Sequence, residues 1–144
     1  MHTETYLTDP ALLQKRIHNL HLKRGKGRLD KPRVKKLTEK QRKIIHLKTN
    51  GRCHFCGIKV PVNNFQADHV VCHVRGGEHV EDNYLPSCFI CNNYRWHYLP
   101  GELQIILKMG VWARTQVEHQ TMIGLDIANK FSKKESSRIK RNDK

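Results

Sequence analysis

Two Cys-x-x-Cys pairs, Cys53/Cys56 and Cys88/Cys91, constrain the fold of this chain more than any other feature. Each pair spans a tight turn that points both sulfurs at the same place, and four thiolates are the usual tetrahedral ligand set of a structural zinc. Because four thiolates saturate the ion, we expect this Zn²⁺ to fold the domain and to do no chemistry. Buried free thiols and a redox pair are the alternatives.

The composition indicates that the fold needs stabilisation by a structural metal. Hydrophobic residues make up 38% of the 144 residues and aromatic residues 7%, which predicts one domain with extensions and a small core. No apolar run reaches the roughly 18 residues of a membrane span. Residues 1–13 lack the basic-then-apolar pattern of an export signal, so we expect a cytoplasmic protein in which metal is favoured over disulfides. The fifth cysteine, Cys72, is then a small core residue.

The charge is high and unevenly distributed. The formal net charge is +14; residues 1–50 hold 14 Lys/Arg against 4 Asp/Glu, and residues 51–144 hold 13 against 9. A basic N-terminal block favours a polyanionic partner, most often nucleic acid, whereas a merely solvated arm is the alternative. We expect phosphate contacts from the basic side chains of this block, namely Lys23, Arg24, Lys26, Arg28, Arg33, Lys35 and Lys36.

The hydrophobic periodicity predicts an α+β chain, with helices on both sides of two short strands. The expected strands cover residues 65–71 and 84–88. The expected helices cover residues 8–24, 37–51, 91–99, 101–110 and 121–131. Thr38 with Gln41 fits a capping box. Pro100-Gly101 is expected to break the chain between helices, Gly110 to end one, and the charged residues 132–144 to fray.

The second motif fills the 31 residues between the two cysteine pairs, a spacing longer than the 15–20 residues or so that are typical of zinc ribbons. It contains Asp68-His69, a Gly-Gly loop, and Asn83 placed 14 residues after His69; Asn92 follows 9 residues later, directly after the second pair. His54, inside the first cysteine turn, is expected to face solvent.

This order of residues resembles the HNH endonuclease superfamily, over Gly51 to about His97. The resemblance is carried by "CHFC", "ADH", "GG", "NYLPSC" and "CN" in this sequence. It implies a small zinc-stapled ββα-metal core with flanking α-helices at both ends. We therefore divide the chain into residues 1–37, a basic helix and linker; residues 38–99, the nuclease core; and residues 100–144, a helical extension and charged tail.

The resemblance also implies roles for the matched residues of the motif. His69 would be the general base on water, since its pKa is near working pH. Asp68 and Asn92 would hold a catalytic Mg²⁺ or Mn²⁺. Asn92 stands where the family name has His, and an asparagine oxygen at this position suits a hard, oxygen-preferring ion. Asn83 would fix the strands and orient His69. Each residue also has a plainer alternative role. His69 could be a structural histidine, Asp68 a surface acid, Asn83 a turn residue and Asn92 a helix cap.

The function that follows is a metal-dependent endonuclease that hydrolyses phosphodiester bonds in DNA. Arg75 and Arg95 are the candidate phosphate clamps beside the site. One rival is a non-catalytic zinc-knuckle module that binds nucleic acid through the basic block. Another is the same nuclease fold acting on RNA or on branched or modified DNA. The sequence predicts no membrane partner and leaves the oligomeric state open.

Overall fold

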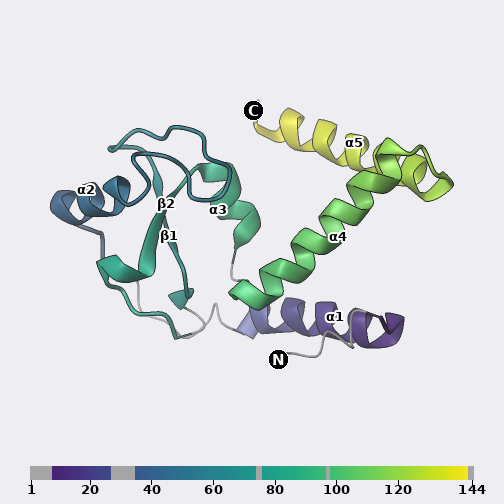
Figure 1. The fold of residues 1–144 in the computed structure, drawn as a ribbon, viewed down its shortest axis with the longest axis horizontal. Helices are drawn as coiled ribbons and strands as arrows, with labels where there is room; N and C mark the ends of the chain where they lie inside the picture. Colours follow the sequence, from purple (N-terminus) through teal and green to yellow (C-terminus); the bar gives the residue numbers. More distant parts are fainter. Residues whose placement is uncertain (1–7, 27–34, 74–75, 97, 143–144) are drawn as a thin grey trace. The chain divides into compact units, whose positions relative to one another are not determined.

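The computed structural model describes residues 8–26, 35–73, 76–96 and 98–142, and the side chains of His21 and Lys23–Lys26 lie outside that description. The chain divides into two compact units, Met1–Pro100 and Gly101–Lys144, each considered by itself. The described elements are helices and one two-stranded sheet, so the predicted α+β class is confirmed (Figure 1). In the described ranges, no helix combines the length and the apolar character needed to cross a membrane.

The first helix, α1, runs over Pro10–Lys26 and begins as predicted. The Asp9 carboxylate accepts the backbone N–H groups of Ala11 and Leu12, at 2.9 and 3.1 Å, which satisfies donors that have no partner within a helix. Pro10 occupies the first turn, where its missing N–H costs nothing.

Helix α2, Glu39–Leu47, opens with the capping box that the sequence predicts. The Thr38 hydroxyl accepts the Gln41 N–H, and the Gln41 side chain accepts the Thr38 N–H at 2.8 Å. The helix ends before Asn50 and Gly51, which have φ of 52° and 71° and turn the chain toward the first cysteine pair. The boundary is therefore set at both ends by residues whose side chains or backbone freedom suit that position.

The sheet consists of β1, Gln66–His69, and β2, Tyr84–Ser87, paired antiparallel with Asp68 opposite Leu85 and His69 opposite Tyr84. A 3₁₀ turn, η3 (Glu81–Asn83), leads into β2. Helix α2 packs on β2 and η3, and helix α3, Phe89–Arg95, lies against β1. The core between them is small, as predicted, and its buried members are Ile45, Cys53, Val60, Phe65 and Tyr84.

Helix α3, Phe89–Arg95, differs from its predicted span at both ends. It begins two residues earlier than expected because Cys88 serves as its N-cap, accepting the Cys91 N–H at its sulfur. It ends at Arg95 because Trp96 adopts φ 54°, a left-handed conformation that stops an α-helix. The helix thus starts inside the second cysteine pair.

The second unit contains α4, Pro100–Glu118, and α5, Met122–Asn142, which are much longer than the sequence predicts. Pro100 begins a helix where a break was expected, because proline suits the first helical position. Gly110 does not end α4, and residues 132–142 are helical where a frayed tail was expected. At the turn between the helices, Gly124 packs so closely that an added Cβ would lie 2.0 Å from the Gln116 carbonyl oxygen.

Candidate functional site

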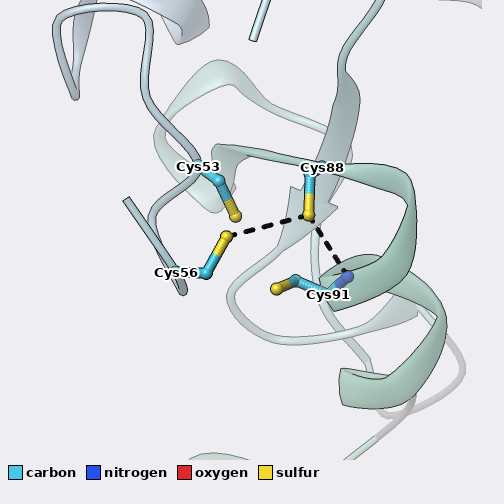
Figure 2. A group of neighbouring side chains, drawn as sticks. All are labelled: Cys53, Cys56, Cys88 and Cys91. Atoms are coloured by element: carbon cyan, nitrogen blue, oxygen red, sulfur yellow. Dashed lines mark hydrogen bonds between the residues drawn. The ribbon is translucent and has the colours of Figure 1, made fainter. Parts of the chain in front are cut away.

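The four predicted cysteines form one cluster, shown in Figure 2, in which all sulfur atoms lie within 4.8 Å of one another. The Sγ atoms of Cys56 and Cys88, which come from different pairs, are 3.9 Å apart. A tetrahedral zinc with Zn–S bonds of about 2.3 Å places its sulfurs about 3.8 Å apart, so the donor set fits a structural metal such as zinc. It is the one group of three or more His, Cys, Asp or Glu at metal-binding distance in the described part of the chain.

Local backbone bonds aim each pair at the cluster. In the first turn, the Gly57 N–H donates to the Cys53 carbonyl at 2.9 Å, and the Cys53 N–H donates to the Ile58 carbonyl at 2.8 Å. Gly57 has φ 78°, which glycine adopts at no steric cost. In the second pair, the start of α3 brings Cys91 back beside Cys88.

The protonation of the thiols is consistent with metal binding. Burial acts to raise the pKa of Cys53, but hydrogen bonds from the backbone of Cys56, Cys88 and Phe55 and from the Ser87 hydroxyl lower it to about 6. Cys53 is therefore a thiolate at neutral pH, the form that binds metal.

Cys91 shows the opposite shift: burial, followed by the neighbouring thiols of Cys88 and Cys56, raises its pKa above the ordinary value. Four thiolates cannot all be ionised at this distance without a cation between them, and a divalent ion removes that repulsion.

A separate pocket of about 270 Å³ lies beside the end of β1. Its lining includes Asp68 and His69 from β1, Asn92 from α3, and His73 and Cys72 from the loop after β1. Three of the four residues that the resemblance assigns to catalysis thus border the same space, whereas the sulfur cluster is a different site. Cys72 was predicted to be a core residue and was not expected in this pocket.

His69 is half-buried, with its ring against Tyr84 at a centroid distance of 4.2 Å. Its Nε2 is buried and has no hydrogen-bond partner among the described residues. Burial, followed by the positive charge that His79 can carry, lowers the pKa of His69 below 6.5. The ring is therefore neutral at neutral pH, which is the form that can accept a proton. His79 in turn is hydrogen-bonded to the Tyr84 hydroxyl through Nδ1, so His79 and Tyr84 both lie next to the His69 ring.

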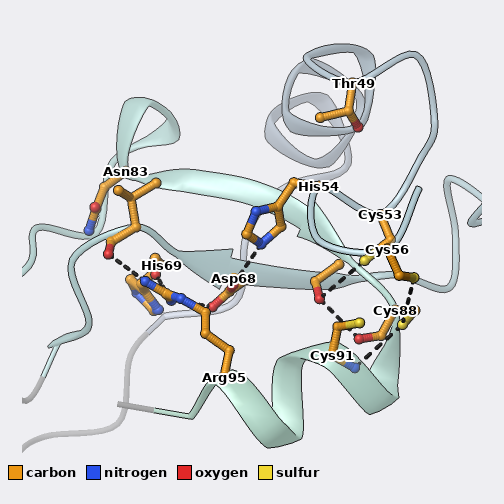
Figure 3. Close-up of polar contacts among 12 residues, drawn as sticks. Thr49, Cys53, His54, Cys56, Asp68, His69, Asn83, Cys88, Cys91 and Arg95 are labelled. Atoms are coloured by element: carbon orange, nitrogen blue, oxygen red, sulfur yellow. Dashed lines mark hydrogen bonds and ion pairs between the residues drawn. The ribbon is translucent and has the colours of Figure 1, made fainter. Parts of the chain in front are cut away.

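Asp68 is buried, with a side-chain exposure of 5%, and both of its oxygens are bonded (Figure 3). Oδ1 accepts the Arg95 Nη1 at 2.6 Å, and Oδ2 accepts the His54 Nε2 at 2.8 Å. The expectation that His54 faces solvent is therefore wrong. Its ring is hydrogen-bonded to Asp68, the candidate metal ligand.

Arg95 does not fit its predicted role as a phosphate clamp. It is 6% exposed, and its guanidinium also donates to the carbonyls of His69 and Val70. A phosphate could reach it only if these internal bonds were broken. Its geometry instead ties the end of α3 to the end of β1.

Asn83 holds the loop between the strands. Its Nδ2 donates to the carbonyls of Val71 and Glu78 at 2.9 and 2.8 Å, and its Oδ1 accepts the Val71 N–H at 2.9 Å. These bonds go to loop backbone and not to the His69 ring, so any effect on His69 passes through the position of the strand end.

The predicted basic residues are described only in part. Lys35 and Lys36 are exposed. Arg28, Arg33 and Arg75, and the side chains of Lys23, Arg24 and Lys26, lie outside the described residues.

Part of the chain matches a known protein family. The model of the HNH endonuclease family matches residues 53–95, a span that runs from the first zinc-type cysteine to Arg95 and includes the pocket residues of β1 and α3. No curated protein matches the chain. The family match covers residues 53–95, and within that span the four-sulfur cluster is consistent with a zinc-binding domain of this kind.

Proposed function

We propose that this protein is an endonuclease that hydrolyses phosphodiester bonds in DNA with the help of one divalent cation. The observation that carries the proposal is the shared pocket of Asp68, His69 and Asn92, which lies apart from the thiolate cluster. A saturated thiolate site has no open position for a substrate, so any chemistry belongs to this second site.

Asp68 and Asn92 would hold the cation through a carboxylate and an amide oxygen. A carboxylate oxygen offers two lone pairs, so Asp68 keeps acceptor capacity although each oxygen has one donor. Mg²⁺ and Mn²⁺ bind through one or two such protein oxygens and retain several waters, which matches this small donor set. When bound, the cation supplies positive charge to the phosphate and leaving oxygen.

His69 would take the proton from the attacking water. Burial keeps the ring neutral, so the ring can accept a proton. Its contact with Tyr84 fixes the plane of the ring, and the hydrogen bond from the Arg95 guanidinium to the His69 backbone carbonyl fixes the end of the strand. A neutral, restrained imidazole beside the cation ligands is what general-base catalysis requires.

DNA is proposed as the substrate because of the net charge of +14 and its concentration in residues 1–50. Exposed Lys35 and Lys36 would contribute phosphate contacts outside the pocket. The same charge serves RNA or branched DNA, and a binding module without catalysis needs only the charge and the zinc. That module leaves the pocket of Asp68, His69 and Asn92 without a purpose.

The decisive experiment is plasmid nicking with His69→Ala, in Mg²⁺ and in Mn²⁺, next to His119→Ala. His119 is an exposed histidine of the second unit and gives the matched control. Loss of a general base typically lowers the rate by about 10²–10⁴-fold. We expect that loss for His69→Ala with zinc content and gel-shift affinity unchanged, and none for His119→Ala. If His69→Ala nicks plasmid as fast as the parent, the binding-module function is correct instead.

A further inference from the structure

His54 connects the two sites of the domain. It lies between Cys53 and Cys56 in the first cysteine turn, and its backbone N–H donates to the Pro86 carbonyl of β2 at 2.8 Å. Its ring reaches away from the sulfurs to Asp68 of β1, as Figure 3 shows. The residue is thus held by one strand and bonded to the carboxylate on the other.

The bond has a defined direction. A buried carboxylate that pairs with an arginine only accepts, so the His54 Nε2 carries the hydrogen and donates it to Oδ2. The His54 side chain is 18% exposed, and that of Asp68 is 5% exposed, so water competes little for this bond. A charge-assisted bond in such a site is strong and fixes the rotation of the carboxylate.

Arg95 approaches the same carboxylate from α3. Its Nη1 bonds Oδ1, and its Nη2 donates to the Val70 carbonyl at 2.5 Å. Arginine and a carboxylate tend toward a bidentate pair, with two parallel bonds. Here the pair is made through a single oxygen, because His54 holds the other one. Without that donor, we expect the carboxylate to turn both oxygens toward the guanidinium.

We propose that His54 is a positioning residue through which the cysteine turn keeps Asp68 oriented toward the pocket for a divalent cation. The inference rests on the proposed function, because it takes Asp68 as a cation ligand. It adds a physical link by which the structural metal site supports the catalytic one, since any distortion of the turn moves the His54 ring. Partners that orient a metal ligand typically contribute 10–100-fold to metal affinity.

The test compares His54→Gln with His54→Leu in the full chain. Glutamine offers an amide N–H at a reach similar to that of Nε2, whereas leucine has similar bulk and no donor. Phe55→Leu, in the same turn and 40% exposed, controls for a change of packing there. Binding of Mn²⁺ alone is followed by electron paramagnetic resonance of the free ion, and zinc is counted by elemental analysis. The Mn²⁺ concentration for half-maximal plasmid nicking is measured on the same preparations.

We expect His54→Leu to keep its zinc, to weaken Mn²⁺ binding by about 10-fold or more, and to recover most of its nicking rate at saturating Mn²⁺. His54→Gln and Phe55→Leu should stay close to the parent. Unchanged Mn²⁺ affinity in zinc-loaded His54→Leu would overturn the inference and leave the nuclease proposal standing.

Two further outcomes also count against the inference. If both His54→Leu and a second donor-free variant, His54→Phe, lose zinc, His54 serves the fold of the turn and not the orientation of Asp68. A parent chain that neither binds Mn²⁺ nor nicks plasmid removes the cation ligand itself, and so refutes the proposed function together with this inference.

Discussion

The zinc-type core of the first unit and the helical second unit are stabilised in different ways. The core is built from strands of four residues and a helix of seven, which are too short to be stable alone. It depends on particular groups, namely four sulfurs, a buried Asp68–Arg95 pair and the three bonds of Asn83. The second unit has helices of 19 and 21 residues, which repeat the same backbone bond many times. Single substitutions should therefore matter more in the core.

Removal of the metal should show the difference in stability between the two units most clearly. Structural zinc contributes an apparent 10–16 kcal/mol or so, as much as the whole stability of a typical domain. We expect a strong chelator, or Cys53→Ser, to abolish zinc binding and to expose the backbone amides of residues 38–96 to fast hydrogen exchange. The amides of α4 and α5 should keep most of their protection.

Cys72→Ser is the matched control, because Cys72 is as buried as Cys53 but is not one of the four clustered sulfurs. It should retain one zinc per chain. Loss of zinc from Cys72→Ser to the same extent as from Cys53→Ser would contradict the four-cysteine assignment.

The parts of the molecule that could be predicted from the sequence are those set by local residue patterns. The cysteine spacing and the Thr38–Gln41 box are local chemical patterns, so the cysteine turn and the start of α2 could be predicted from them, and the hydrophobic periodicity predicted the approximate strand positions. The order of Asp68, His69 and Asn92 led to residues that line one pocket, because β2 pairs with β1 and continues through Cys88 directly into α3.

The features that the sequence did not predict depend on contacts between residues far apart in the chain, or on the sum of many small contributions to helix stability. His54 and Asp68 are 14 residues apart, and nothing in a cysteine turn indicates where its second residue points. Arg95 was predicted to clamp phosphate, but its guanidinium is buried and donates to three internal acceptors. The helix through Gly110 was missed because one glycine costs only about 1 kcal/mol, which the flanking helix formers outweigh.

The Gly-Gly loop gives the next largest predicted effect, and its two glycines should differ. A Cβ on Gly77 would lie 1.6 Å from the Val71 carbonyl oxygen and 2.9 Å from the Asn83 Nδ2, so the loop held by Asn83 would have to move. Backbone cannot swing aside as a side chain can, so we expect Gly77→Ala to cost about 3 kcal/mol or more in the free energy of unfolding.

Gly76 has φ 89° but nothing within 4 Å of an added Cβ. Gly76→Ala should then cost only the conformational strain, about 1–2 kcal/mol. Urea unfolding of both variants, followed by tryptophan fluorescence, compares them directly. Equal costs would mean that the close approach of Gly77 to Val71 is not part of the folded loop.

The second unit has one position that resembles the core in its sensitivity. A Cβ on Gly124 would lie 2.0 Å from the Gln116 carbonyl oxygen, where the chain turns from α4 into α5. Gly124→Ala should lose about 2 kcal/mol through overpacking, after the gain in helix propensity is subtracted. The measurement is hydrogen exchange of the amides on both sides of the turn, in the zinc-loaded chain. If their protection is unchanged, the backbone of this turn can shift to accommodate the added Cβ, and the second unit is less sensitive than the core.

Gly110→Ala should have the smallest effect and the opposite sign. Gly110 lies in the interior of α4, is exposed, and has nothing within 4 Å of an added Cβ. Alanine removes the excess backbone entropy of glycine in the unfolded chain, so the helix should gain about 1 kcal/mol. That gain corresponds to about a 5-fold increase in the protection of the central α4 amides. The core amides should not change, because they belong to the other unit. A loss of protection in α4 would show that Gly110 is needed for a close contact, and the second unit would then depend on individual residues as the core does.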